Sequence, residues 1–431
     1  MTYVIWASVL LSLVGDLYRH SYFGIAAVLV LLVVIARSPG AWLARGSGRL
    51  ALILTGIALG MIAVHGDVGR ILRDAAGYFG IIALLLCVSL IRIPVRAMRL
   101  DAAVLGLLAR VSERRRVPTV MVSSTMLAPV LNLGTVALLG AMLRDRSIPT
   151  VSVPRAVTRG VGAALLWAPT FAPTALIMTQ FPNVTWSHTL PIAIPLALAA
   201  LLLGGREKGV VAIDAKEATG PEPLWNGLLL VAVIGALMLV LRIGLHMSIT
   251  SAVSLAAVGG FAIWTLLWDA RRAPEIRSGL RDHTENAWRQ VSAESVLFLS
   301  AGLLASVLQD PYWSASMEPV RAIVDTPGWM SIAIIIFGIP ALTVVGIHPI
   351  VPYTLLVGQI TPDGIGISPE GLYMLWTVVW MLSMLLSPAS ALNLSAASSF
   401  GVSPWRVGAR ANWSFGVMFG AVAVVVLREW S

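Results

Sequence analysis

The sequence predicts an all-α membrane protein whose chain crosses the bilayer many times. Of its 431 residues, 58% are hydrophobic and only 12% are charged, about half the charge of an ordinary soluble domain. The hydrophobic residues gather in runs of roughly 17 to 22, the length that a helix needs to cross a bilayer. Only helices or closed barrels satisfy the hydrogen bonds of the backbone in lipid. These runs lack the alternation of apolar and polar residues that barrel strands show. A polytopic helical fold follows.

The apolar runs predict about 11 transmembrane helices, numbered here by residue. They lie near 3–15, 22–36, 49–65, 77–93, 160–180, 188–204, 224–242, 247–268, 290–308, 371–399 and 411–427. The first run begins directly after Met1, without a basic segment or a cleavage motif, and we interpret it as a retained helix instead of a signal peptide. The single cysteine, Cys87, excludes disulfides and cysteine metal sites.

Two further apolar stretches, 118–142 and 329–360, are too long for one straight helix. Helix-breaking residues lie near the middle of each, around Asn132 in the first and around His348 in the second. We interpret both stretches as re-entrant hairpins, because irregular backbone at membrane depth is tolerated where protein or a water-filled cavity surrounds it. A kinked crossing helix is the alternative.

The basic residues predict the orientation of the chain. The net charge is +9, and arginines fill the short loops between apolar runs, which indicates a membrane surface and no nucleic-acid partner. If Met1 is cytoplasmic and both hairpins return to the side they left, 24 of the 30 basic residues lie inside and 6 outside. This is the positive-inside pattern. It predicts a bacterial-type cytoplasmic membrane, with Ser431 in the periplasm.

The two halves of the chain resemble each other. Segments around Pro169 and Pro388 align at a constant offset of 219, which also pairs Trp186 with Trp405. The linker before the first hairpin is rich in arginine, whereas the linker before the second hairpin is not. Equivalent elements are therefore predicted to face opposite sides of the membrane. Such inverted repeats are common in transporters.

The predicted division therefore has four parts. It comprises a leading transmembrane helix (1–21), a first inverted repeat (22–204) with hairpin 118–142 and broken helix 160–180, a cytoplasmic linker (205–223), and a second inverted repeat (224–431) with hairpin 329–360 and broken helix 371–399.

In such folds the substrate binds where discontinuous helices meet, because their N-terminal ends suit an anion and their unwound carbonyls and hydroxyls suit Na⁺. Each polar residue in these segments has an alternative role in helix packing. The predicted substrate-binding residues are Ser123, Ser124, Thr125, Asn132, Thr170, Thr174, His348, Ser390, Asn393 and Ser395. Candidate positions for Na⁺ lie near Asn132, Thr135, Gly346 and Asn393.

Only Glu294 and His348 are ionisable residues that we expect inside the membrane. We place Glu294 near the cytoplasmic start of its helix, paired with Arg289. With no arginine or lysine expected at the midplane and no carboxylate relay, the pattern favours Na⁺ as the coupling ion. His348 leaves proton coupling open. No other cofactor is expected.

The predicted order of elements resembles that of the ion transporter superfamily. One leading helix is followed, in each half of the chain, by three helices, a hairpin, a broken helix and a final helix. That group includes divalent anion/sodium symporters and the large membrane subunits of tripartite (TRAP) dicarboxylate transporters. Ser123-Ser124-Thr125 and Gly346-Ile347-His348-Pro349 stand where the symporters carry a Ser-Asn-Thr signature, which neither reproduces. The resemblance implies a homodimer whose transport domain, holding the hairpins and broken helices, moves as an elevator.

The predicted function is secondary transport of a small, carboxylate-like organic anion, coupled to Na⁺ or H⁺, with no enzyme activity. One alternative is a subunit that works only with partners, as in TRAP-like systems. Another is a membrane-embedded glycan polymerase or ligase, which needs a larger periplasmic loop than the roughly 20 residues expected here.

Cysteine labelling tests the predicted orientation. In a Cys87→Ala background, a cysteine at Ser278 should react only after the membrane is permeabilised, because that loop is assigned to the cytoplasm. A cysteine at Asp325 should react with an impermeant reagent in intact cells. Labelling of both from the same side would contradict the inverted repeat.

Overall fold

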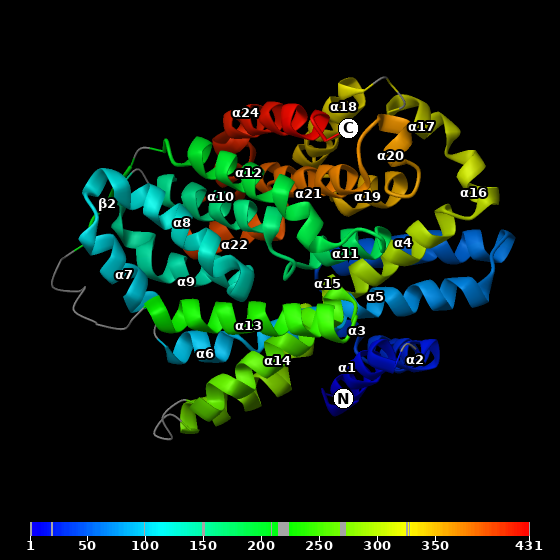
Figure 1. Ribbon diagram of the computed structural model, residues 1–431, viewed down its shortest axis with the longest axis horizontal. Helices are drawn as coiled ribbons and strands as arrows, with labels where there is room; N and C mark the ends of the chain where they lie inside the picture. The colour runs from blue at the N-terminus through cyan, green and yellow to red at the C-terminus, as the bar shows by residue number, and fades with distance from the viewer. Residues whose placement is uncertain are drawn as a thin grey trace.

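The computed structural model describes residues 2–18, 20–98, 100–148, 151–207, 209–213, 224–267, 273–324, 326 and 328–430. Within these ranges the chain is almost entirely helical, which confirms the predicted all-α class (Figure 1). The exception is an antiparallel pair of two-residue strands, β1 (Ser147–Ile148) and β2 (Val210–Val211). Met1, Asp325, Ser431 and most of the predicted linker, 214–223, lie outside the described residues.

The described part of the chain holds eight helical segments long and apolar enough to cross a membrane, and four shorter apolar helices. The eight and three of the four coincide with the 11 predicted spans, and the fourth, Trp329–Val344, is the first arm of the second hairpin. The chain is a multi-pass membrane protein.

The described residues of the first half form twelve helices. They are α1 (Thr2–Tyr18), α2 (Ser21–Arg37), α3 (Pro39–Trp42), α4 (Gly46–Val64), α5 (Val68–Ser89), α6 (Arg92–Ala97), α7 (Leu100–Arg110), α8 (Glu113–Leu131), α9 (Gly134–Leu143), α10 (Ser152–Trp167), α11 (Ala172–Gln180) and α12 (Trp186–Gly204), with a 3₁₀ turn, η1 (Arg144–Arg146), after α9.

The second half contains twelve more. They are α13 (Leu224–Gly244), α14 (Ile249–Leu267), α15 (Ala273–Leu308), α16 (Pro311–Ser316), α17 (Glu318–Val324), α18 (Trp329–Val344), α19 (Ile350–Leu356), α20 (Pro362–Ile365), α21 (Pro369–Leu386), α22 (Ala391–Phe400), α23 (Pro404–Val407) and α24 (Ala409–Arg428).

Both predicted hairpins turn back toward the side from which they start. Near the start of α8, Arg116 donates to the carbonyl oxygen of Val211 in β2 (2.6 Å), and the same strand pairs with Ser147, just beyond α9. In the second hairpin, Arg321 precedes α18 and its guanidinium lies 3.4 Å from Oε1 of Gln359, which follows α19. The ends of each hairpin therefore lie together, which a kinked crossing helix would not allow.

The packing of the helices repeats along with their order. α8 packs on α10 as α18 packs on α21, and α12 packs on α10 as α24 packs on α21. α4 packs on α15 as α14 packs on α5. The helical backbone is interrupted after α10 at Ala168 and after α21 at Ser387, positions 219 residues apart. The two halves thus share one internal arrangement, while their opposite orientation across a membrane stays a prediction.

The broken helices begin earlier than predicted. The segment expected at 160–180 is α10 and α11, and the one expected at 371–399 is α21 and α22. The segment expected at 290–308 is the end of α15, a helix of 36 residues whose first turns are polar. Hydropathy finds only the apolar part of a helix, whereas the backbone stays helical until a breaking residue or a turn ends it.

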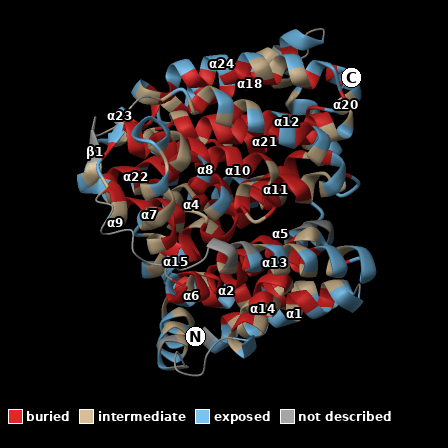
Figure 2. Cartoon of the chain, turned by 60° about the vertical axis from the view of Figure 1, so that its left-hand side comes forward, coloured by how far each residue is buried: buried red, intermediate tan, exposed pale blue. Residues whose placement is uncertain are grey.

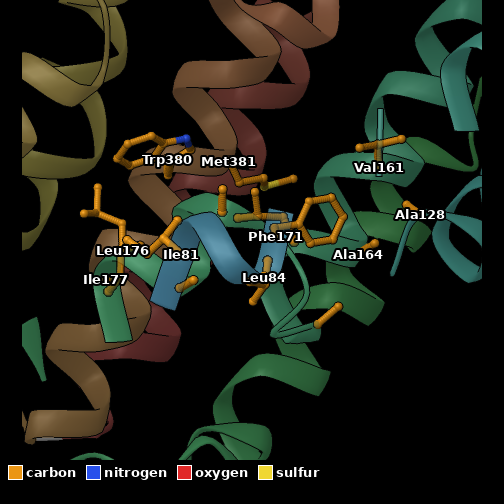
Figure 3. Close-up of a cluster of buried hydrophobic side chains, with 14 of the residues drawn as sticks. Ile81, Leu84, Ala128, Val161, Ala164, Phe171, Leu176, Ile177, Trp380 and Met381 are labelled. Carbon is orange, nitrogen blue, oxygen red and sulfur yellow. The ribbon is translucent and has the colours of Figure 1, made fainter. Parts of the chain in front are cut away.

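The helices form two groups that meet at α5 and α15. In Figure 1, α1, α2, α13 and α14 lie together below, and the hairpins and broken helices, α8–α12 and α18–α24, lie above. Figure 2 shows buried residues concentrated along α8, α10, α21 and α5, with exposed ones on the outer helices. The apolar core reaches the junction of the groups, where Phe171 lies near Leu84 of α5 and Met381 of α21 (Figure 3).

A buried charged network ties α10 to the end of α12 and to α24. Arg159, one of the 24 basic residues that the predicted orientation places on the cytoplasmic side, lies inside α10 and is 5% exposed. Its guanidinium pairs with Glu207 (3.1 Å), donates to Asn412 Oδ1 (2.8 Å) and lies 4.8 Å from the ring centre of Phe415. Because buried charges are tolerated when paired and hydrogen-bonded, this network accounts for an arginine inside an apolar segment.

The closest approach of α8 to α10 depends on a glycine. A Cβ on Gly160 would lie 2.4 Å from the carbonyl oxygen of Met121 and 2.6 Å from Cβ of Ser124. Thr125, in the same stretch of α8, donates its hydroxyl to the Gly160 carbonyl at 3.0 Å. Small residues at such contacts let two helix backbones pack directly against each other.

We expect Gly160→Ala to destabilise the protein, since the two backbones would have to separate, at a cost of about 1–3 kcal/mol. Gly60→Ala on α4 is the matched control, because nothing lies within 4 Å of its added Cβ. Thermal unfolding of both variants in detergent measures the difference. Equal unfolding temperatures for the two variants would contradict this packing account.

Candidate functional site

A cavity of about 950 Å³ lies where both hairpin tips and both helix breaks meet. Its wall includes Asn132 from the first hairpin and Gly346 to Pro349 from the second. The breaks contribute Phe171 to Pro173 and Ala389 to Leu392. α4, α5, α15 and α21 supply most of the remaining wall. The structure thus brings together the four segments in which the sequence predicted a site.

The tip of the first hairpin is formed at Asn132. This residue has a positive φ of 53°, which non-glycine residues other than asparagine and aspartate seldom adopt. Its N–H donates to the Ala128 carbonyl at 2.7 Å, and its own carbonyl accepts from the Thr135 N–H at 3.1 Å. The turn therefore presents Asn132 to the cavity while α8 and α9 run back from it.

The hydroxyl residues of α8 do not reach this cavity. Ser124 donates to the Val120 carbonyl (2.7 Å), and Thr125 donates to the carbonyls of Met121 and Gly160 (3.0 Å each). Ser123 lines a separate, small apolar cavity between α7, α8 and α13. These three predicted residues lie in the interface of α8 with its neighbours, more than one turn before the hairpin tip.

The first helix break leaves hydroxyl groups without partners. α10 ends at Trp167, so the Trp167 carbonyl has no donor from a following helical turn and accepts instead from the indole N–H of Trp186 at 2.8 Å. The hydroxyl oxygens of Thr170 and Thr174, and that of Thr135 at the start of α9, are buried and have no hydrogen-bond partner among the described residues. Thr170 lines a smaller cavity of about 260 Å³ that adjoins the main one.

The second hairpin turns at Gly346, whose φ of 103° strongly favours glycine. His348 follows it and lines the cavity. Its Nδ1 accepts a hydrogen bond from the Ile350 N–H at 3.2 Å, at the start of α19. With Nδ1 as the acceptor, the proton of a neutral imidazole lies on Nε2, which leaves one donor for a ligand.

The second helix break is closed by Asn393. Its Nδ2 lies within hydrogen-bond distance of three carbonyl oxygens, those of Met384 (3.1 Å), Leu385 (3.0 Å) and Ser387 (2.8 Å). Ser390 lines the cavity; it accepts from the Asn393 N–H and donates to the Met384 carbonyl. Asn393 itself is fully buried, and its Oδ1 has no partner in the part of the chain that the structure describes. Ser395, also predicted, is half-buried on α22 and does not line the cavity.

Two arginines and a glutamate that the sequence did not place in the site line these cavities. Arg45 and Glu294 line both the main and the smaller cavity, and Arg92 lines the smaller one. Gln290 holds both guanidinium groups, accepting from Arg45 at its backbone carbonyl (2.9 Å) and from Arg92 at Oε1 (3.0 Å). Glu294 is one turn further along α15, so its carboxyl group faces the same side.

The predicted pairing of Glu294 with Arg289 is wrong. Arg289 is exposed and lines neither cavity, and the charges that act on the Glu294 carboxyl group are those of Arg45 and Arg92. The predicted orientation counts both arginines among the 24 basic residues on the cytoplasmic side. Only the packing of α4 and α6 against α15 brings them to the cavity wall, and no local pattern reports that contact.

The far end of α11 is held by a polar bridge. Gln180 donates to the hydroxyl group of Tyr78 on α5, and its Oε1 accepts from Nε2 of Gln309 at 2.7 Å, just after α15. The bridge joins the group of broken helices to the two helices on which it rests. The cavity opens at the other end of α11, where Arg45 is exposed.

These features define a class of protein: a multi-pass helical membrane protein with two hairpins and two broken helices around one central cavity. A solved structure has the same fold. The Alcanivorax borkumensis YdaH transporter, whose crystal structure is described as revealing an unusual topology, aligns over 89% of this chain and 97% of its own, with a TM-score of 0.56 and 13% identity.

The sequence matches no protein-family model and no curated protein. At 13% identity the likeness to YdaH establishes a membrane-transporter fold. The resemblance to the ion transporter superfamily stays a prediction.

We expect Asn393→Ala to lower the stability of the protein, because carbonyl groups at the second break lose their donor. Each unpaired buried carbonyl costs about 1–3 kcal/mol. Ser395→Ala on the same helix is the matched control, since Ser395 forms no side-chain hydrogen bond within the described ranges. Thermal unfolding compares the two. If the Asn393 variant unfolds at the temperature of the control, its amide does not close the break.

Proposed function

We propose that this chain is an elevator-type secondary transporter that moves a small, carboxylate-like organic anion across the bacterial cytoplasmic membrane. The observation that carries the proposal is the cavity at the junction of hairpin tips and helix breaks, with the guanidinium group of Arg45 at its wall and that of Arg92 at the adjoining smaller cavity. Binding sites of many transporters lie where discontinuous helices meet, near the middle of the membrane.

Helix N-termini support an anionic substrate. The cavity wall includes Ala172 at the start of α11, Ala391 at the start of α22 and Gly46 at the start of α4. The free N–H groups and the dipole at such ends favour negative charge. Arg45 and Arg92 add two positive charges, and a guanidinium group binds a carboxylate through paired hydrogen bonds.

The rest of the wall is apolar, with Leu85, Leu297, Phe298 and Trp380 among its side chains. It suits the carbon skeleton of an organic molecule better than a small inorganic ion, because contact with such a wall removes apolar surface from water.

Groups in and near the cavity support either Na⁺ or H⁺ as the coupling ion. Hydroxyl and amide oxygens without partners, on Thr135, Thr170, Thr174 and Asn393, are the kind of ligand that Na⁺ takes. Such oxygens accompany both breaks, so Na⁺ would travel as cargo beside the substrate. Proton coupling requires a group that changes its charge, and Glu294 and His348 line the cavity.

An elevator movement fits the two groups of helices. The hairpins and broken helices pack together, while α1, α2, α13 and α14 form a separate group across α5 and α15 (Figure 1). In the proposed transporter the second group is the scaffold and pairs with a second copy of the chain. The exposed apolar side chains of the outer helices would then face lipid or that copy.

A thermal-shift screen of the purified protein tests the proposal. Carboxylates and sulfonates of varied skeleton are added with and without Na⁺, and at least one should raise the unfolding temperature, because a ligand of the native state stabilises it. Arg92→Gln should weaken binding of that anion by about tenfold or more, the loss of one charge-assisted hydrogen bond.

Arg410→Gln is the matched control, since Arg410 is exposed on α24 and lines neither cavity. Failure of every anion to stabilise the wild-type protein would contradict the proposed substrate class. An equal loss of affinity in the two arginine variants would remove Arg92 from the site.

A further inference from the structure

Glu294 stands at the point where the two cavities join. It lines both of them, in the middle of α15, and is half-buried. The charges of Arg45 and Arg92 reach its carboxyl group, yet neither guanidinium forms an ion pair with it within the described ranges. Both guanidinium groups are held by Gln290 instead. The glutamate is therefore close enough to influence the arginines and is not held in its ionised form by an ion pair within the described ranges.

The net charge of the cluster formed by Arg45, Arg92 and Glu294 depends on whether Glu294 carries a proton. With Glu294 ionised, Arg45 and Arg92 leave one net positive charge; with Glu294 protonated, they leave two. α5 presents only apolar side chains and Ser89 to the two cavities, and His348 from the second hairpin is the other titratable group at their wall. An anion at the guanidinium groups competes with ionised Glu294 for the same positive charge.

A third cavity connects the cluster to the surface. It has a volume of about 880 Å³ and shares Ser89, Arg92 and Gln290 with the smaller cavity. Its wall is polar and contains Arg96, Arg281, Asp282, His283 and Glu285, of which Arg281 and Glu285 are paired at 2.9 Å. Water in this cavity can carry protons and anions as far as Arg92, next to Glu294.

We propose that Glu294 binds the proton that accompanies the transported anion. A proton from the water of the open cavity adds to one carboxylate oxygen of Glu294 as the anion takes its place beside Arg45 and Arg92. Both leave together on the other side of the membrane, where the carboxylate forms again. Because the coupling is reciprocal, bound anion favours protonated Glu294, and protonated Glu294 favours bound anion. The inference rests on the proposed transport function and assigns H⁺ as its coupling ion.

The test measures the charge of the cavity directly and needs no substrate. Ser47 lines the main cavity on the first turn of α4, so Ser47→Cys in a Cys87→Ala background places a thiol near Arg45. The purified protein reacts with an anionic and with a cationic methanethiosulfonate reagent, at about pH 5 and about pH 8, a range in which a carboxyl group withdrawn from water titrates. The ratio of the two rates cancels the fraction of thiolate.

With Glu294 present, the ratio of anionic to cationic rate should rise on the order of tenfold from the higher to the lower pH, since one unit of charge acts with opposite sign on the two reagents. In Glu294→Gln the ratio should be high at both pH values. His348→Gln and Asp282→Asn, the matched controls at the hairpin tip and in the outer cavity, should keep the dependence. Glu294→Ala is the second neutral variant if the first does not fold.

A pH dependence that survives in the neutral Glu294 variants would overturn the proposal, as would its loss in His348→Gln or its absence in the parent protein. These outcomes are separate from those of the ligand screen. If no anion stabilises the protein in the screen, the transport function is refuted even if Glu294 titrates. If Glu294 does not titrate, the proposal of anion transport coupled to Na⁺ still stands.

Discussion

A helix that stops inside a membrane protein leaves carbonyl groups that must find donors, and this requirement shapes the centre of the molecule. Without water, each unpaired carbonyl is costly, so a break persists only where side chains supply hydrogen bonds. At the first break the indole of Trp186 donates to the Trp167 carbonyl. At the second, Nδ2 of Asn393 serves the carbonyls left by α21. The cavity exists because both breaks are stabilised in this way.

The two halves meet the same requirement with different chemistry. By the offset of 219, Trp186 corresponds to Trp405, which is 49% exposed, and Asn393 corresponds to Thr174, whose buried hydroxyl has no partner within the described ranges. The backbone arrangement is repeated while the side chains that support it are not. Such divergence is expected once the two breaks face different parts of a substrate or ion, since any donor that reaches the carbonyls suffices for folding.

The charged groups at the cavity depend on those breaks in turn. The starts of α4, α11 and α22 bring partial positive charge to one place, and Arg45 and Arg92 add to it. Glu294 offsets part of this charge. Ionisable groups in a membrane interior are costly unless they are paired or solvated, and here they border connected cavities. The buried Arg159–Glu207 pair illustrates the other solution, with every charge bound to a fixed partner.

The sequence by itself determined the class of fold, the spans, the hairpins and the positions of the breaks, because these follow from hydropathy and from proline, glycine and asparagine at fixed places. It thereby found Asn132, Gly346, His348 and Ser390, which line the cavity. Only the tertiary structure placed Arg45, Arg92 and Glu294 there and directed Ser124 and Thr125 into helix contacts. The physical reason is that breaks are local properties of the backbone, whereas the side of a helix that faces a cavity is decided by which distant helix packs against the other side.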